Sequence, residues 1–236
     1  MEADAVSELE KENAAAAAMD YIEDGMTLGL GTGSTAKYFV QMVGERVAEG
    51  LKIRGVPTSE QTRKLAEACG VPLIDIEQVD RIHVTVDGAD EVDEQAQLIK
   101  GGGAALLREK IIADTSDLMV VIADTSKQVE TLGRFPLPVE VTPFGFTITA
   151  KKTYDALCAA GILKPRINVR TGEGSQPIVT DGGNYILDCQ CGTIPDAPRA
   201  AALLSNVPGI VEHGLFINQC RVVIIGAEDG ATIYEY

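Results

Sequence analysis

The feature that most constrains the fold of this chain is the alternation of short apolar segments with helical segments through its first half. Apolar strands are predicted at residues 26–30, 52–56, 71–74 and 82–86. A continuous apolar run follows at residues 118–123, and such a run is typical of a parallel strand buried on both faces. Strands that alternate with helices predict an open, doubly wound, mostly parallel α/β sheet. Ligands bind such sheets at the carboxyl ends of the strands, where the polar loops of this chain lie.

The pattern changes at Phe135, where Phe-Pro-Leu-Pro places two prolines in an extended connection. The segments that follow are predicted as strand, helix, strand, strand, helix and strand, the last at residues 210–217. This βαββαβ order is the ferredoxin-like α+β pattern. One more apolar strand, at residues 221–225, is expected to return to the first sheet. We therefore predict two domains, one over residues 1–134 with 218–236 and a smaller one over residues 135–217.

Composition excludes several classes of partner. The 236 residues include 20 basic and 35 acidic side chains, and the resulting formal net charge of −15 argues against a general nucleic-acid surface. No apolar run approaches the roughly 20 residues that span a bilayer, and the N-terminal Met-Glu-Ala-Asp is acidic where a targeting signal would be basic. These features predict a cytoplasmic protein with no membrane partner. A phosphate-bearing ligand would need local cations, so each lysine beside a glycine loop is informative.

The cysteines and histidines predict no metal centre. Cys189 and Cys191 could form half of a metal-binding set, but no second pair or suitably spaced histidine completes it. The five cysteines are odd in number and fall mostly in apolar segments, so we expect reduced thiols in the core. His83 and His213 lie in predicted strands and are expected to be structural.

Residues 31–35, Gly-Thr-Gly-Ser-Thr, lie between a predicted strand and a predicted helix. The backbone N–H groups at such a helix N-terminus attract anions. The loop lacks the Gly-Lys-Ser/Thr of a Walker A motif and the third glycine of a dinucleotide-binding loop. Its three hydroxyl side chains suit a single phosphate. A plain tight turn is the alternative.

Asp87-Gly-Ala-Asp90 follows the predicted strand at residues 82–86, so Asp87 and Asp90 are expected to face the same crevice. Gly88 would let the chain turn sharply between them. The spacing of glycine and glutamate excludes a calcium loop of the helix-loop-helix type. Contacts to sugar hydroxyls or proton transfer fit the two carboxylates better, and a solvated acidic turn is the alternative.

The segment Lys100-Gly-Gly-Gly-Ala-Ala-Leu-Leu-Arg-Glu109 brings together a cation, a run of backbone amides and a carboxylate. The three glycines let the backbone approach a ligand closely. On a helix that starts near Gly103, Ala105 and Ile112 share the face of Glu109 and would desolvate its carboxylate. This set suits removal of a proton next to a carbonyl, with the amides holding the oxyanion. The alternative is a glycine hinge before a helix with an exposed glutamate.

Two further lysines are candidate ligands for an anion. Lys127 follows the apolar run at residues 118–123 and so lies at the carboxyl end of another predicted strand. Lys11 lies on the first predicted helix, residues 6–21, where a solvated lysine is the more common case.

Taken together, these motifs resemble the type A ribose-5-phosphate isomerases. The resemblance runs in one order along nearly the whole chain, at residues 31–35, 87–91, 100–110, 123–127, 133–141, 180–188 and 207–216. It implies an enzyme that interconverts D-ribose 5-phosphate and D-ribulose 5-phosphate through an enediolate, in the non-oxidative pentose phosphate pathway. It also implies that no cofactor or metal takes part and that the protein is a homodimer or homotetramer.

The resemblance implies roles for individual residues as well. Glu109 would move a proton between C2 and C1, and Lys100 with the glycine amides would stabilise the negative oxygen. Asp87 would help to open the furanose ring and shuttle protons among the sugar oxygens. Contacts to the sugar and its phosphate are implied for Thr32, Gly33, Ser34, Thr35, Asp87, Gly88, Ala89, Asp90, Lys100, Gly101, Gly102, Gly103, Lys127 and Lys11. No role is assigned to Phe144-Gly-Phe146.

Two other functions occur on related folds and stay open as alternatives. A sugar-phosphate sensor domain of a repressor would carry a DNA-binding helix-turn-helix ahead of the domain, whereas 25 residues of acidic character precede the first predicted strand here. An acyl-CoA transferase would use a glutamate as nucleophile, but such chains are usually longer and would need a broader basic surface.

Overall fold

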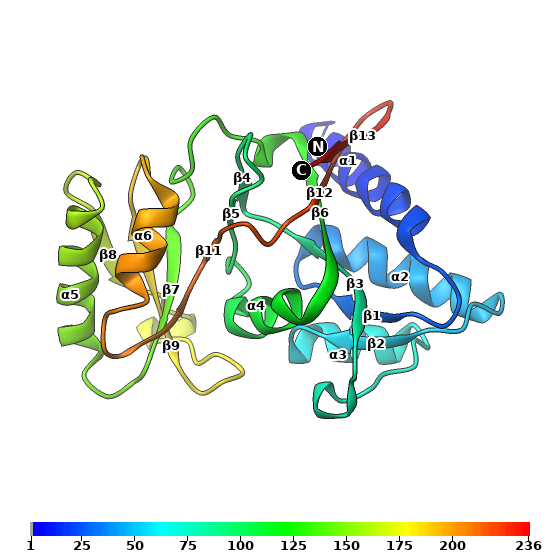
Figure 1. Ribbon diagram of the computed structural model, residues 1–236, viewed down its shortest axis with the longest axis horizontal. Coiled ribbons are helices and arrows are strands. Elements are labelled where there is room, and N and C mark those ends of the chain that lie inside the picture. Colours follow the sequence, from blue (N-terminus) through cyan, green and yellow to red (C-terminus); the bar gives the residue numbers. More distant parts are fainter. Residues whose placement is uncertain (1) are drawn as a thin grey trace. The chain divides into compact units, whose positions relative to one another are not determined.

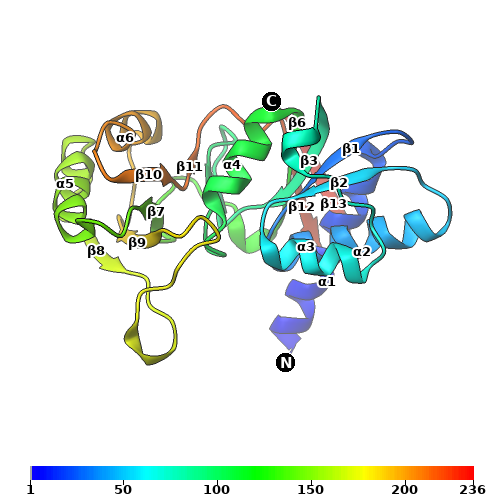
Figure 2. The same ribbon diagram turned by 90° about the horizontal axis from the view of Figure 1, so that it is seen from below.

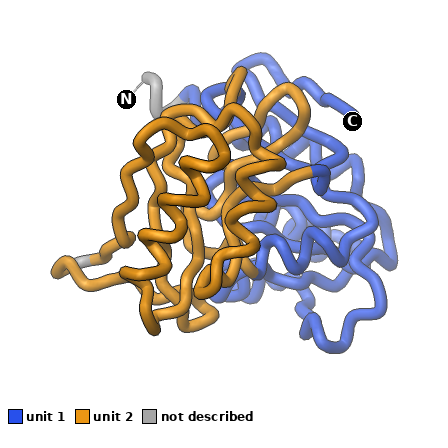
Figure 3. The backbone as a smooth tube through the Cα atoms, turned by 60° about the vertical axis from the view of Figure 1, so that its left-hand side comes forward, with its two compact units in different colours: residues 1–89, 108–128, 218–236 blue, residues 90–107, 129–217 orange. Residues whose placement is uncertain are grey.

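The computed structural model describes residues 2–236, and the chain divides into two compact units (Figure 3). The first unit combines the chain up to residue 89 with residues 108–128 and 218–236. The second unit combines residues 90–107 with residues 129–217. The predicted division therefore differs from the structure at residues 90–107 and 129–134, which the sequence pattern placed in the first domain.

Two short strands explain why residues 90–107 belong to the second unit. Strands β4 (Glu91–Val92) and β5 (Leu98–Ile99) pair with each other, and β5 also pairs with β11 (Leu215–Phe216). The three strands form a small antiparallel sheet within that unit. Strands of two residues carry no detectable hydrophobic period, so no sequence pattern could predict them.

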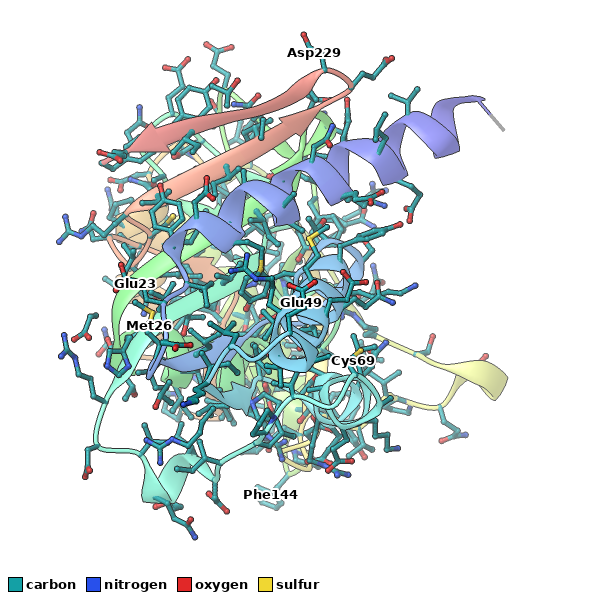
Figure 4. The ribbon with its side chains drawn as sticks, turned by 90° about the vertical axis from the view of Figure 1, so that its right-hand side faces the viewer. Glu23, Met26, Glu49, Cys69, Phe144 and Asp229 are labelled. Carbon is teal, nitrogen blue, oxygen red and sulfur yellow. The ribbon has the colours of Figure 1, made fainter. Side chains whose placement is uncertain are left out.

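The first unit is built around a six-stranded sheet in the order β13-β12-β6-β3-β1-β2 (Figure 1). Neighbouring strands are parallel, except that β12 and β13 form an antiparallel hairpin with Asp229 at its turn (Figure 4). The last six residues of β6 are all buried, as the continuous apolar run predicted. The strands are β1 (Thr27–Leu30), β2 (Arg54–Pro57), β3 (Ile82–Gly88), β6 (Ser116–Asp124), β12 (Val222–Ala227) and β13 (Gly230–Glu235).

Helices cover both faces of this sheet. On one face, Leu28 and Leu30 of β1 share a buried apolar cluster with Phe39 of α2. Gly29 points to the opposite face, where a Cβ would lie 2.7 Å from Cγ2 of Ile112 in α4. The predicted doubly wound α/β fold is confirmed. The helices are α1 (Glu2–Ala18), α2 (Ser34–Ala48), α3 (Glu60–Ala68) and α4 (Leu106–Thr115), with single 3-10 turns at Met19–Tyr21, Ile76–Gln78 and Thr125–Lys127.

The second unit contains a four-stranded antiparallel sheet in the order β10-β7-β9-β8. Its helices α5 and α6 pack against each other (Figure 2). The chain order is the predicted βαββαβ run, so the ferredoxin-like pattern is confirmed. The elements are β7 (Leu137–Val141), α5 (Phe146–Ala159), β8 (Arg166–Val169), β9 (Tyr185–Gln190), α6 (Ala197–Leu204) and β10 (Ile210–His213), with a 3-10 turn at Glu173–Ser175.

Two strand predictions were wrong in detail, and one strand was missed. The strand predicted over residues 210–217 is divided between β10 and β11, which belong to different sheets. Residues 71–74 form no strand and contribute one isolated bridge, between Leu73 and Gly55. Strand β13 was not predicted, because its residues are mostly exposed and lack an apolar stripe.

The cysteines and histidines are placed largely as expected. Cys189, Cys191 and Cys220 are buried, whereas Cys158 is exposed, contrary to its expected place in the core. His83 lies in β3 and its Nδ1 accepts a hydrogen bond from the Thr27 amide at 2.9 Å. Burial raises the pKa of the Cys191 thiol to about 12 and that of Cys189 well above its usual value. Among residues 2–236, no helix combines the length and apolar character needed to cross a membrane.

Candidate active site

The glycine loop at residues 31–35 joins the end of β1 to the start of α2, as predicted. Gly33 precedes the helix with φ +117°, a conformation that favours glycine. Gly33 and Ser34 are exposed, whereas Thr35 is buried. The N–H groups of the first helical turn therefore begin at an accessible loop, which suits an anion.

The Thr32 side chain is hydrogen-bonded within the protein. Its hydroxyl lies 2.7 Å from Thr58 Oγ1, 2.8 Å from Ser59 Oγ and 3.0 Å from Thr62 Oγ1. A hydroxyl has one proton and two lone pairs, so these three partners satisfy it. The Thr32 side chain thus ties the loop to the start of α3, and the exposed residues Gly33 and Ser34 are the better candidates for ligand contact.

Asp87 is completely buried at the carboxyl end of β3. Its Oδ1 accepts hydrogen bonds from the amides of Thr32, at 3.0 Å, and Gly88, at 2.8 Å. The orientation of the carboxyl group is thereby fixed from the backbone. Gly88 continues β3 without a positive φ, so the prediction of a sharp turn at this glycine was wrong.

Glu109 lies in the first turn of α4 and is 3 % exposed. Ala105 and Ile112, four residues before and three residues after Glu109, are both buried, as predicted. The helix starts at Leu106 rather than near Gly103. Helix α4 leads directly into β6, which is parallel to β3, so the start of α4 lies toward the carboxyl end of the sheet. Asp87 and Glu109 therefore belong to the same end of the first unit.

Each of the two carboxylates has a deeply buried oxygen. Oδ2 of Asp87 and Oε2 of Glu109 are buried oxygens that accept no hydrogen bond from the described residues. Burial of ionisable oxygens is costly, and such groups concentrate where proton transfer takes place. The structure thus excludes the alternative of an exposed helix glutamate.

The segment from Lys100 to Gly103 belongs to the second unit. Lys100 is 2 % exposed, and its Nζ lies 5.6 Å from the centre of the Phe216 ring. Its backbone N–H donates to the carbonyl of Gly214 at 2.9 Å. Gly101 has φ +104°, which explains why the loop begins with glycine.

Asp90 holds this glycine loop. Its Oδ2 accepts a hydrogen bond from the Gly102 amide at 2.7 Å. The Gly102 N–H, which the sequence assigned to an oxyanion, is thus directed at a protein carboxylate. Asp90 itself is half-buried, as is Ala89 beside it.

Arg170 is a residue that the sequence analysis missed. It follows β8 directly, and its Nη1 donates to the carbonyls of both Gly101 and Gly102 at 2.9 Å. Nε and Nη2 donate to the two carboxylate oxygens of Asp188 in β9, at 2.9 and 2.5 Å. An arginine at the end of a strand is common, so only its partners could reveal this role.

Lys127 ends the 3-10 turn that follows β6, as predicted, and it is half-buried. In the same turn, Thr125 Oγ1 donates to Glu10 Oε1 of α1 at 3.0 Å. The turn of Lys127 is therefore joined to the helix that carries Lys11.

Lys11 is engaged on the surface of α1. Its Nζ donates to Glu8 Oε1 at 2.6 Å, and the Tyr38 hydroxyl donates to the other oxygen of Glu8 at 2.6 Å. The hydrogen bonds from Lys11 and Tyr38 lower the pKa of Glu8. Any anion bound by Lys11 would compete with this carboxylate.

The two phenylalanines of the segment at residues 144–146 lie in different environments. Phe144 is 94 % exposed (Figure 4), whereas the ring of Phe146 meets that of Tyr185 edge-on with 5.5 Å between centres. Phe146 therefore helps to anchor the start of α5.

Known proteins match this chain over nearly its whole length. The family model of ribose 5-phosphate isomerase A (phosphoriboisomerase A) matches residues 54–230. The chain belongs to this family. Ribose-5-phosphate isomerase A of Maricaulis maris is 60 % identical over 227 residues, which cover 96 % of this chain and 97 % of the relative. That of Rhodopseudomonas palustris strain TIE-1 is 56 % identical, covering 95 % and 97 %.

Solved structures of the family have the same fold. A D-ribose-5-phosphate isomerase in complex with phospho-erythronic acid superposes with a TM-score of 0.90 at 38 % identity, covering 98 % of this chain and 99 % of that one. The enzyme from Plasmodium falciparum gives a TM-score of 0.90 at 33 % identity, covering 97 % and 98 %. Asp87, Lys100, Glu109 and Lys127 all fall within the stretch that the family model matches.

Proposed function

We propose that this protein interconverts D-ribose 5-phosphate and D-ribulose 5-phosphate, as the names of its relatives indicate. The observation that carries the proposal is the buried carboxylate of Glu109, which follows a lysine and three glycines by six residues. A buried carboxylate can accept a proton from carbon, and the adjoining amides and ammonium can stabilise the charge that results.

The reaction is a transfer of one proton between neighbouring carbons. Glu109 removes the proton from C2 of the open-chain aldose, and the electrons of the broken C–H bond form the C1–C2 double bond of an enediolate. The C1 carbonyl oxygen takes the negative charge, next to Lys100 and the glycine amides. Glu109 then returns the proton to C1, while the proton of the C2 hydroxyl passes to the negative C1 oxygen, which gives the ketose with a C2 carbonyl and a C1 hydroxyl.

Asp87 is proposed to move protons among the sugar oxygens. Ring opening breaks the bond between C1 and the ring oxygen, so one proton leaves the C1 hydroxyl and one reaches the ring oxygen. The two backbone amides that hold Asp87 Oδ1 keep its other oxygen in one orientation for this transfer. We propose that Asp90 binds sugar hydroxyls in addition to holding Gly102. Gly88 and Ala89, which precede Asp90, are proposed to contact the sugar as well.

The phosphate is proposed to bind the first turn of α2. The N–H groups of Gly33, Ser34 and Thr35 and the Ser34 hydroxyl supply donors there. Lys127 supplies a positive charge, assisted by Lys11. These cations matter because the whole chain carries a formal charge of −15, which repels a phosphate in general.

We also propose that the protein works without a metal or organic cofactor, in the cytoplasm, as a homodimer or homotetramer. Light scattering coupled to gel filtration tests the last part, and a monomer at micromolar concentration would contradict it.

The deciding experiment is formation of ketopentose from ribose 5-phosphate by purified protein dialysed against EDTA. We expect rapid turnover by the wild type and a loss of about 10³-fold or more in kcat for Glu109→Gln, because the amide cannot accept the proton. Asp114→Asn, which changes an exposed acid on the same helix, is the control and is expected to stay within about twofold.

Each other result has a defined meaning. Absence of turnover by the wild type contradicts the isomerase and leaves a sugar-phosphate sensor, which would still bind ribose 5-phosphate. A covalent thioester on Glu109 after incubation with acyl-CoA would indicate the transferase instead. Turnover that returns only with added metal would contradict the metal-free mechanism.

A further inference from the structure

The Arg170 guanidinium joins an acidic side chain to the glycine loop. Four of its five N–H donors have partners: two donate to Asp188 and two to the carbonyls of Gly101 and Gly102. The side chains of Arg170 and Asp188 are 17 % and 25 % exposed. A paired, planar and mostly buried guanidinium has little freedom to move.

The backbone at both ends of this pair is also fixed. The Arg170 N–H donates to the carbonyl of Ile186, and the Arg170 carbonyl accepts from the Ile178 N–H. Asp188 pairs with Pro138 on one side and Asn168 on the other, in the interior of the four-stranded sheet. The sheet of the second unit thus supports the position of the guanidinium.

Hydrogen bonds to carbonyls determine where the amides point. In a trans peptide the C=O of one residue and the N–H of the next point in opposite directions. Because Arg170 binds the carbonyls of Gly101 and Gly102, the N–H groups of Gly102 and Gly103 are directed away from Arg170. The Gly102 N–H does meet Asp90 Oδ2, at 2.7 Å. A donor that binds a carbonyl also polarises its peptide and strengthens the N–H on the other side.

We propose that Arg170, held by Asp188, is a positioning residue for the oxyanion site of the isomerase. It fixes the peptides of Gly101 and Gly102, so that the Gly103 N–H faces the oxygen that becomes negative in the enediolate. Arg170 acts through the loop and takes no part in binding the sugar or its phosphate. This inference rests on the proposed function, because it assigns the loop amides to the reacting oxygen.

The test compares Arg170→Lys and Arg170→Ala with the wild type in kcat and KM for ribose 5-phosphate. Lysine keeps the charge but cannot form the fork with Asp188 and bind two carbonyls at once. We expect kcat to fall about 10- to 100-fold in both variants, less than the roughly 100- to 1000-fold loss caused by removing an oxyanion donor itself, because Arg170 acts through the loop. KM should stay within about threefold, because the phosphate ligands are unchanged.

Two further measurements separate positioning from general stability. Guanidinium ion at a non-denaturing concentration should restore part of kcat in Arg170→Ala, and it should leave the kcat of Arg134→Ala unchanged. Arg134 is the matched control, because its Nε lies 3.6 Å from Glu91 in the same unit. If Arg170→Ala fails to fold, Asp188→Asn provides the second variant, in which the side chain at position 188 offers the guanidinium one acceptor oxygen instead of two.

The outcomes distinguish this proposal from the proposed function. Hydrogen exchange of the amides at residues 101–104 should accelerate in Arg170→Lys whether or not the protein is an isomerase. If the wild type isomerises ribose 5-phosphate and Arg170→Lys retains its kcat within about twofold, the positioning role is wrong and the isomerase stands. Equal proportional changes in kcat and KM, without rescue by guanidinium, would also overturn it, because they would indicate a purely structural pair.

Discussion

Gly31 shows how one residue without a side chain shapes the acid–base site. A Cβ at this position would lie 2.3 Å from Oδ1 and 2.5 Å from the backbone Cα of Asp87. A backbone atom cannot move aside as the end of a flexible side chain can. The ends of β1 and β3 therefore approach closely only because residue 31 is glycine, and this approach lets the Thr32 amide reach Asp87.

We predict that Gly31→Ala lowers the free energy of unfolding by about 1–3 kcal/mol through overpacking. It should also lower kcat, because Asp87 is displaced. Gly88→Ala is the control, since a Cβ there would meet its nearest neighbour at 3.8 Å without backbone strain. Its stability should stay within about 0.5 kcal/mol of the wild type. Urea denaturation measures the stability of both variants, and equal midpoints for the two would contradict the steric argument.

Buried thiols make a second prediction at the residue scale. Burial raises the pKa of Cys191 to about 12, above its value of about 9 in the unfolded chain. Between these two pKa values the folded state keeps a proton that the unfolded state loses. The contribution of this thiol to the free energy of unfolding is therefore complete below pH 9 and is lost as the pH rises toward 12.

The free energy of unfolding of the wild type should thus fall more steeply between pH 9 and 11 than that of Cys191→Ala. The difference in slope should approach about 1 kcal/mol per pH unit. Cys191→Ala also loses packing at every pH, so the comparison concerns slopes measured by urea denaturation at several pH values. Parallel slopes would show that the thiol titrates alike in both states.

At the scale of elements, the start of α3 connects a helix cap to the glycine loop. Ser59 caps this helix by accepting a hydrogen bond from the Thr62 amide at 3.0 Å. The same oxygen receives the Thr32 hydroxyl at 2.8 Å. The Ser59 hydroxyl that caps α3 therefore also restrains the glycine loop before α2.

We expect Ser59→Ala to lower stability by about 1 kcal/mol through loss of the cap and to raise KM for ribose 5-phosphate several-fold. Asp196→Ala removes the equivalent cap of α6, where Asp196 accepts the Arg199 amide at 2.9 Å. This control should lose similar stability and keep its KM. A KM for Ser59→Ala equal to that of the wild type would show that the loop keeps its shape without the network.

At the scale of the whole molecule, the first unit is assembled from three separate stretches of the chain, and the last of them is residues 218–236. Folding of this unit therefore depends on the last residues of the chain. Strand β12 pairs in parallel with β6, and its first five residues are buried. Strand β13 lies at the edge of the sheet and is largely exposed. The two strands of this one hairpin therefore differ in their importance.

A chain that ends at Ile217 should fail to fold, because β6 loses its neighbour and the core loses the β12 side chains. A chain that ends at Glu228 retains β12 and should fold with reduced stability. Circular dichroism and thermal denaturation distinguish these outcomes. A cooperative transition in the shorter chain would show that the remaining strands form the sheet on their own.

The features that depend on local pattern could be predicted from the amino-acid sequence. The alternation of strands and helices, the ferredoxin-like order and the apolar neighbours of Glu109 all follow from periodicity and spacing. The tertiary structure alone decided where polar groups distant in sequence meet. Arg170 binds carbonyls 68 and 69 residues away, and Thr32 meets residues near position 60. The sequence could not predict these partners, because a hydrogen bond forms within about 3 Å and its formation depends on how loops from different strands are placed.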